Sequence, residues 1–186
     1  MLKKLLAIVF LLLPISSFAQ VASATRGRGL DLSVGAEYSN FRPDWGSTRL
    51  QGMAAFADLD ELFINKLGVE GEGRWLRFNQ PEGLTQDNYL IGPRYRLLRY
   101  HKFSFYGKFL MGGGFITYPN NIGSGSYFAY VPGGTVQYRL SHHWSLRGDY
   151  EYQFWPSAPG LVFTYPNPSH GLTPSGFSAG VSYRIF

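Results

Sequence analysis

Two pairs of polar side chains between positions 143 and 151 are candidates for catalysis. His143 and Ser145 are two positions apart, so a histidine could activate a serine hydroxyl as a nucleophile. Asp149 and Glu151 have the same spacing, and two carboxyl groups can divide general acid and general base work. Residues two apart share one face of a β-strand, so each pair could be in contact.

Each of these residue pairs also has a purely structural explanation. The carboxylate pair Asp149 and Glu151 follows Arg147, and a second carboxylate pair at 70 and 72 precedes Arg74, so both suit ion pairing. The adjacent histidines His142 and His143 fit an exposed turn better than a metal site. The chain has no cysteine, which excludes disulfides and thiolate metal ligands. We therefore predict no catalytic residue, no metal site and no cofactor.

The segment that holds these residues reads as a β-strand. From Trp144 to Phe154, aromatic and aliphatic residues alternate strictly with polar ones, three of which are ionisable. Seven further segments show this division to different degrees. The eight expected strands cover about 30–40, 49–58, 67–78, 88–97, 103–115, 127–140, 144–154 and 176–185.

Three features of this pattern lead to more specific expectations. The second segment alternates least clearly, and its outward face is expected to carry Leu50, Ala54 and Phe56, with Met53 inside. Pro93 lacks an amide donor, so a bulge or a missing hydrogen bond is expected there. The proline-rich segment 155–174 is expected to be a long irregular loop.

A membrane explains why the apolar face is so aromatic and the polar face so charged. Unpaired backbone groups are costly in lipid, so the strands must close on themselves. The predicted fold class is all-β, an eight-stranded antiparallel transmembrane β-barrel with a charged lumen filled by side chains. The expected lumen charge network comprises Glu37, Glu70, Glu72, Arg74, Arg94, Arg96, Lys108, Arg139, Arg147, Asp149, Glu151 and Arg184, and Asp31 and Arg49 are placed on the same face.

The N-terminus resembles an export signal. Residues 1–19 have two lysines, an apolar run and a small-residue end, so they are expected to form a cleavable Sec-type signal peptide. Cleavage after Ala19 or after Ala24 fits the small-residue pattern. The predicted organisation is a signal peptide at 1–19, a periplasmic N-terminal segment at 20–29 and a barrel domain at 30–186.

Charge and loop lengths bear on partners and orientation. The formal net charge of +5 includes Lys3 and Lys4 of the expected signal, so we predict no nucleic-acid partner. Short connections alternate with longer ones, which places both termini in the periplasm and the 155–174 segment outside. Aromatic residues near the strand ends suit interfacial girdles: Tyr38, Trp75, Tyr89, Trp144, Phe154 and Tyr183.

The signal, the alternating strands and the C-terminal sequence together resemble a known family. The segments 89–96 and 146–152 and the ending Gly180, Tyr183, Ile185 and Phe186 are similar to those of small outer-membrane β-barrels of the OmpA-like/opacity-protein type. The resemblance implies an assembly signal read by the barrel-assembly machinery, with outer-membrane lipid and lipopolysaccharide as partners. Phe186 departs from the outward register by one step. We expect a monomer in the cell outer membrane.

Three functions remain open at this stage. The leading hypothesis is a non-enzymatic barrel with an envelope-structural or surface-contact role through its extracellular loops. His143 and Ser145 are similar to the pair of barrel-type lipid A deacylases, so a lipid-modifying enzyme is the first alternative. A small transporter for apolar solutes is the second, and it would need a lateral opening near 112–114 or 132–134.

Overall fold

The structure of the protein is a computed structural model, which describes residues 30–45, 48–62, 66–164 and 167–185. The signal peptide predicted at 1–19, the segment 20–29 and Phe186 of the predicted assembly signal lie outside the described residues. Within these described ranges, no helix is long and apolar enough to cross a membrane.

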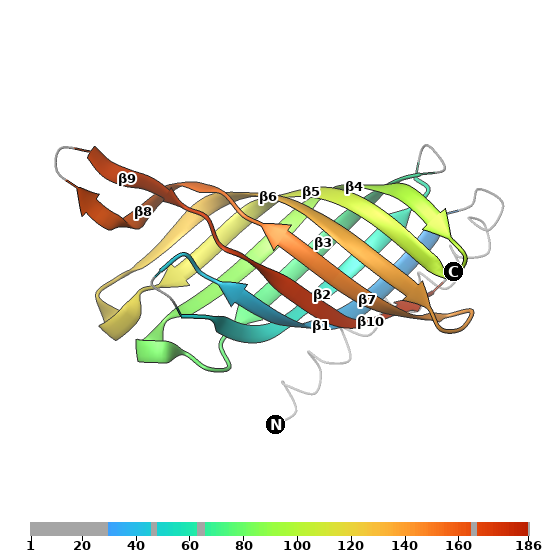
Figure 1. Ribbon diagram of the computed structural model, residues 1–186, viewed down its shortest axis with the longest axis horizontal. Coiled ribbons are helices and arrows are strands. Elements are labelled where there is room, and N and C mark those ends of the chain that lie inside the picture. Colours follow the sequence, from blue (N-terminus) through green and yellow to red (C-terminus); the bar gives the residue numbers. More distant parts are fainter. Residues whose placement is uncertain (1–29, 46–47, 63–65, 165–166, 186) are drawn as a thin grey trace, which may run out of the picture.

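Eight strands close into one antiparallel barrel, which confirms the predicted fold class (Figure 1). They are β1 (Asp31–Arg42), β2 (Leu50–Asp60), β3 (Leu67–Leu76), β4 (Thr85–Tyr100), β5 (Phe103–Thr117), β6 (Ser124–Arg139), β7 (Trp144–Tyr152) and β10 (Ser175–Arg184). Each strand pairs with its sequence neighbours except at one seam. There β1 pairs with β10, from Ser33↔Arg184 to Arg42↔Ser175, and closes the barrel. Closure satisfies the backbone groups that a free edge would expose.

The two ends of the barrel differ. One end carries the short β2–β3, β4–β5 and β6–β7 connections, and we call it the turn end. The other end carries the β1–β2, β3–β4 and β5–β6 connections, with short 3-10 helices η2 (Pro81–Gly83) and η3 (Pro119–Asn121), and we call it the loop end. Strands β4, β5 and β6 extend further toward the loop end than the alternation predicted, so the barrel is longer on that side (Figure 1).

The segment expected to be an irregular loop forms a β-hairpin instead. Strands β8 (Trp155–Thr164) and β9 (Asn167–Leu172) pair with each other and project beyond the loop end (Figure 1). The prolines of this segment argue against strands within a sheet. A two-stranded ribbon, however, has two free edges where a missing amide donor costs little, and the pairing shifts register twice along its length.

The faces of β2 are the reverse of the prediction. Leu50, Ala54 and Phe56 lie inside the barrel, buried to at least 95%, whereas Met53 is 47% exposed on the outer wall. Aromatics dominate the other outward faces, which is why the alternation predicts a lipid-facing Phe56 ring. Asp58 shares the side of Phe56, and a carboxylate turned toward lipid would cost more than an aromatic ring turned inward.

Two irregularities interrupt β4. Its pairing with β5 passes from Ile91↔Met111 directly to Arg94↔Lys108, so the ladder has a gap at Pro93, as the missing donor predicts. A register shift between Arg96 and Leu98 marks a bulge near the turn end. The bulge changes which residues of β4 face inward beyond it.

The other seven strands present the expected faces. The six predicted girdle aromatics are 37–51% exposed on the outer wall. Trp75 donates from its indole nitrogen to the Tyr89 hydroxyl at 3.0 Å, and Trp144 packs edge-on to Tyr183. Amphipathic rings of this kind are favoured where a bilayer meets water.

Candidate functional site: the filled interior of the barrel

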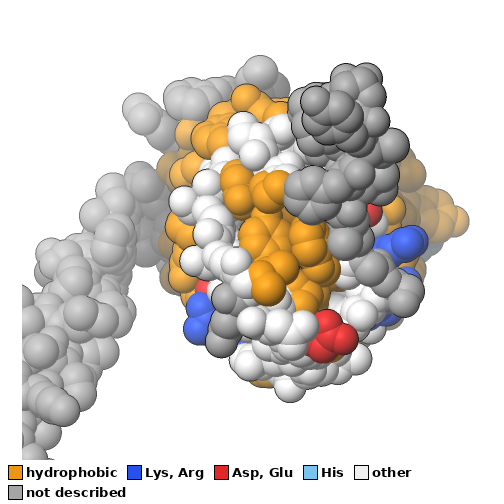
Figure 2. All heavy atoms as spheres, turned by 90° about the vertical axis from the view of Figure 1, so that its left-hand side faces the viewer, with side chains coloured by type: hydrophobic (Ala, Val, Ile, Leu, Met, Phe, Trp, Pro, Cys, Tyr) orange, Lys and Arg blue, Asp and Glu red, His pale blue; other side chains and the backbone are white. Residues whose placement is uncertain are grey.

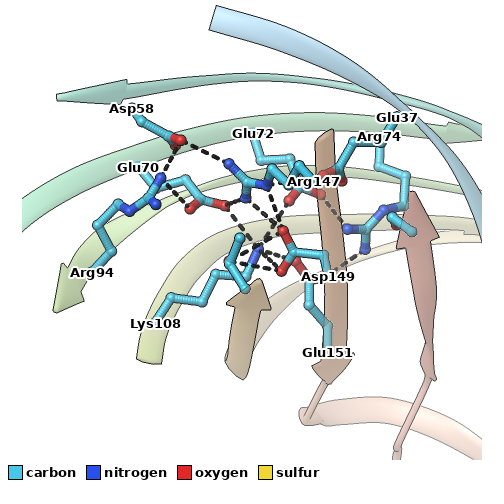
Figure 3. A network of polar contacts seen from close by, with 12 residues as sticks. Glu37, Asp58, Glu70, Glu72, Arg74, Arg94, Lys108, Arg147, Asp149 and Glu151 are labelled. Atoms are coloured by element: carbon cyan, nitrogen blue, oxygen red, sulfur yellow. Dashed lines mark hydrogen bonds and ion pairs between the residues drawn. The ribbon is translucent and has the colours of Figure 1, made fainter. Parts of the chain in front are cut away.

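The middle of the lumen holds a cluster of charged side chains, which we call the charge network (Figure 3). Its members come from β1, β2, β3, β4, β5 and β7, and all are buried. They are Glu37, Asp58, Glu70, Glu72, Arg74, Arg94, Lys108, Arg147, Asp149 and Glu151.

Lys108 contacts four carboxylates of the network. Its Nζ lies 2.8 Å from Glu70, 2.8 Å from Asp149, 2.7 Å from Glu151 and 3.5 Å from Glu72. These carboxylates come from β3 and β7, which lie on different sides of β5 in the barrel order. The ammonium group therefore ties together parts of the wall that share no backbone hydrogen bond.

Arg147 connects four carboxylates from four strands, its own included. Its guanidinium lies 2.9 Å from Glu37, 2.8 Å from Asp58, 2.6 Å from Glu70 and 2.6 Å from Asp149. A planar guanidinium presents five donors in a fixed fork, which suits several acceptors at once.

Each buried arginine of the network also stacks on an aromatic ring that points into the lumen. The guanidinium carbon lies 3.8–4.0 Å from the ring centre in all three cases. The pairs are Arg147 with Phe56, Arg74 with Phe41, and Arg94 with Tyr106. Such stacking leaves the edge of the guanidinium free for carboxylates, and it contributes about 1–2 kcal/mol where water is excluded.

The remaining contacts extend the network along the wall. Arg74 pairs with Glu151 at 2.7 Å and with Glu72. Arg94 pairs with Asp58 and reaches Asp60 at 3.3 Å. A buried charge without a partner is expensive, so this density of ion pairs is what allows six carboxylates and four cations to occupy a narrow lumen.

The structure brings together nine of the twelve residues predicted for the lumen. The other three, Arg96, Arg139 and Arg184, lie nearer the turn end; Arg96 pairs with Glu61 at 3.0 Å and Arg184 with Asp31 at 2.6 Å. Arg49 is exposed, which corrects its placement inside the barrel. The sequence prediction misses Asp58 because it reverses the faces of β2, although the charge of Asp58 is itself a signal for the inner face.

Uncharged groups fill the lumen between the network and the loop end. Gln153 accepts hydrogen bonds from Trp155 Nε1 at 3.0 Å and from Asn88 Nδ2 at 3.3 Å. Next toward the loop end lies a cluster that we call the apolar cap: Phe41, Leu50, Leu76, Leu84, Leu90, Leu110, Ile116, Tyr118, Ala129, Val131, Trp155, Ala158 and Leu172. Figure 2 shows hydrophobic side chains gathered at the centre of this end of the molecule.

The candidate catalytic pairs do not form a reactive arrangement. His143 stacks on Tyr183, with ring centres 5.6 Å apart, and its carbonyl accepts from the Arg184 amide. Among the described residues, no hydrogen bond joins His143 to Ser145. The carboxylate pairs at 70 and 72 and at 149 and 151 belong to the charge network. In the part of the chain that the structure covers, no group of three or more acidic or histidine side chains is arranged to hold a metal ion.

A closed barrel with aromatic rings outside and ion pairs inside defines the class of transmembrane β-barrels. The model of the outer membrane protein beta-barrel domain family matches residues 6–184, and the chain belongs to that family. Membership points to the outer membrane as its location.

Solved structures agree on the fold. Neisserial surface protein A is 11% identical, with a TM-score of 0.58 over 83% of this chain and 96% of that one. A major outer membrane protein from Thermus thermophilus is 13% identical, with a TM-score of 0.56 over 84% of this chain and 100% of that one. A search of curated protein sequences finds no match.

Proposed function

We propose that this protein is a non-enzymatic outer-membrane barrel whose role is structural or surface contact. The observation that carries the proposal is the filled interior. The charge network and the apolar cap occupy successive levels of the lumen, so the surfaces available for function are the outer wall and the two ends.

The connections suggest the orientation. The turn end would face the periplasm and the loop end the outside, because transmembrane barrels have short periplasmic turns and longer extracellular loops. This orientation presents the β8–β9 hairpin at the cell surface. Export through a signal peptide at 1–19 and recognition of Gly180, Tyr183, Ile185 and Phe186 by the barrel-assembly machinery are parts of the same proposal, as is a monomeric state.

Lipopolysaccharide is the partner that the loop end suits. Arg42 on β1 and Arg49 just before β2 adjoin the paired residues Phe41 and Leu50, and both are exposed. Arg77, just after β3, is exposed as well and pairs with Asp87. These guanidiniums lie beyond the aromatic girdle, at the level where lipid phosphates are expected. Replacing Arg42 and Arg49 with Gln should weaken lipopolysaccharide binding, while Lys66→Gln at the turn end should not.

Two measurements test the proposed function. In planar bilayers, the purified protein should give no large steady current, because ion pairs and apolar side chains fill its lumen. A stable open-channel current would contradict the proposal.

A second experiment, in cells that lack the protein, separates the structural role from the surface-contact role by expressing a chain in which a short Gly-Ser turn replaces residues 157–170. This shortened chain should restore the resistance of the cells to detergent if the barrel has the structural role. It should fail to restore that resistance if the function depends on the β8–β9 hairpin.

A lipid-modifying enzyme remains the alternative from a different class. It requires Ser145 to act on an acyl ester, whereas Ser145 lies at the turn end. Ser145→Ala should leave the acyl chains of lipid A unchanged by mass spectrometry. A changed acyl pattern would favour the enzyme and contradict the proposal.

The transporter alternative would need a lateral route through the wall. A shallow groove of about 350 Å³ does lie on the outer wall beside Pro93, Phe109 and Pro132. Behind it stand Arg94 and Lys108 of the charge network, so an apolar solute entering there would meet buried ions. This arrangement supports a closed wall better than a route for apolar solutes.

A further inference from the structure

The turn end of the lumen contains a cavity of about 380 Å³ that the charge network does not fill. It opens among the last residues of the strands and the turns between them, with Tyr106 on its lining. Tyr106 also stacks on Arg94, so its ring lies between the cavity and the network. We call this cavity the basic mouth.

The lining of the basic mouth carries an excess of positive charge. Five cationic side chains face two carboxylates, a formal charge of +3, and His142 is also present. The carboxylates Asp31 and Glu61 are already engaged by Arg184 and Arg96. Among the ion pairs of the described residues, none joins a carboxylate to Arg99, Lys102 or Arg139. The sequence before the barrel, 20–29, has no acidic residue to neutralise them.

The backbone holds these three cations close together. Arg99 pairs across β4 and β5 with Ser104, Ser104 pairs across β5 and β6 with Gln137, and the Arg139 amide donates to the Lys102 carbonyl at 2.9 Å. Like charges brought together at one end of the barrel repel, which is unfavourable unless a counterion is present. An anion between them would remove this repulsion.

The β4 bulge is a second, independent observation. Before it, the inward residues of β4 have even numbers, such as Arg94. After the register shift between Arg96 and Leu98, Arg99 lines the cavity, while Leu97 and Leu98 are both exposed. A regular strand would turn Arg99 outward. Bulges often serve to re-aim a side chain, and here the result is a guanidinium turned into the mouth.

We propose that the basic mouth binds a phosphate group, either of a free phosphate or of an anionic phospholipid headgroup in the adjacent leaflet. The guanidiniums of Arg99 on β4 and Arg139 on β6 and the ammonium group of Lys102, in the turn between β4 and β5, come from three different elements. This arrangement suits a tetrahedral oxyanion better than a planar carboxylate. Ser104, Gln137 and Ser145 add neutral polar groups. The cavity exceeds the size of one phosphate, so an ester substituent fits. This inference is independent of the proposed surface role.

The test uses the full barrel in a non-ionic detergent and in lipid nanodiscs. Inorganic phosphate is titrated by calorimetry in detergent, and phosphatidylglycerol retained from mixed phosphatidylcholine nanodiscs is measured by native mass spectrometry. The double variant Arg99→Gln with Arg139→Gln should weaken binding by about tenfold or more, and added salt should weaken it in the wild type. Lys66→Gln removes a charge at the same end but outside the cavity and should leave binding unchanged.

The outcomes separate the two phosphate sources. Binding of phosphate alone identifies a soluble ligand, and binding of phosphatidylglycerol alone identifies the leaflet; either supports the proposal if the double variant loses it. Arg139→Lys, which keeps the charge but not the planar fork, should give an intermediate affinity and guards against misfolding of the double variant. The proposal would be overturned if the wild type bound neither phosphate nor phosphatidylglycerol, or if the double variant bound as well as Lys66→Gln.

Discussion

At the scale of single residues, Lys108 shows how the interior holds together. Its ammonium group contacts four carboxylates within 3.5 Å, and its side chain is fully buried. Removing one partner of a buried ion cluster leaves charges that are neither hydrated nor paired. The six carboxylates of the network already outnumber its four cations, so the loss of a cation is the more damaging change.

Lys108→Met tests this dependence. The substitution keeps most of the side-chain volume but removes the charge, and we expect it to lower the free energy of unfolding by about 3–5 kcal/mol. Urea unfolding in lipid vesicles, followed by tryptophan fluorescence, measures the change. The matched substitution Lys66→Met, at an exposed turn position, should change stability by less than about 0.5 kcal/mol. Similar effects for the two variants would show that the network contributes little.

At the scale of elements, β2 shows how one strand adapts to its neighbours. The Phe56 ring lies in the lumen against Arg147, at 3.8 Å. Gly35 on the adjacent strand makes room for it, because a Cβ there would lie 2.5 Å from the ring. The inward aromatic ring is thus matched by a missing side chain on β1 and a cation on β7.

The orientation of β2 predicts different surroundings for two adjacent alanines. The Ala55 methyl group faces outward, and the Ala54 methyl group is buried in the lumen. In NMR spectra of the protein in detergent, the Ala55 methyl group should show nuclear Overhauser effects to detergent chains. The Ala54 methyl group should show them to lumen side chains. The opposite result would support the orientation that the alternation alone predicts.

The base of the β8–β9 hairpin is fixed to the barrel through Trp155. This side chain is fully buried in the apolar cap, and its ring lies against Gly114 of β5. A Cβ at Gly114 would lie 2.4 Å from a ring carbon, closer than any real contact. The position of the hairpin therefore depends on a glycine in the wall.

Gly114→Ala tests that contact. We expect it to reduce the free energy of unfolding by about 1–3 kcal/mol, since the added methyl group must displace the indole ring. It should also change the emission of Trp155, isolated by replacing the other tryptophans with Phe. Gly148→Ala is the matched control, because a Cβ there meets nothing within 4 Å. If both variants were equally stable, the ring contact would not constrain the hairpin.

At the scale of the whole molecule, the lumen is layered along its length. The basic mouth lies at the turn end, then the charge network, then the amides around Gln153, then the apolar cap. Two of these layers block the lumen by different means. Ion pairs hold the middle by electrostatic attraction, and the cap excludes water by packing.

Because the two barriers block the lumen by different means, opening one should not create a pore. Trp155→Ala removes the largest side chain of the apolar cap but leaves every ion pair of the network in place. We expect this variant to lose about 3–5 kcal/mol of stability and to remain without steady current in planar bilayers. A steady current would mean that the cap alone seals the barrel.

The amino-acid sequence alone predicts the class of protein, the number of barrel strands and most members of the charge network. In seven strands the charged residues, such as Glu70 and Arg147, mark the inward face clearly. A charge on the opposite face would be costly because that face contacts lipid. In β2 the charge of Asp58 likewise marks the inward face. Phe56 lies on the same face, however, and a prediction that gives aromatic residues more weight than charges turns this face toward lipid.

The three-dimensional structure was needed to show how the inward charges pair between strands, which way β2 faces and which residues line the basic mouth. Pairing depends on neighbours across the barrel, such as Lys108 with Glu151, and alternation within one strand does not specify them. The bulge in β4 depends on its register with β5, so the inward turn of Arg99 follows from the pairing of these two strands. The β8–β9 hairpin likewise forms through contacts between its two halves, which local proline signals obscure.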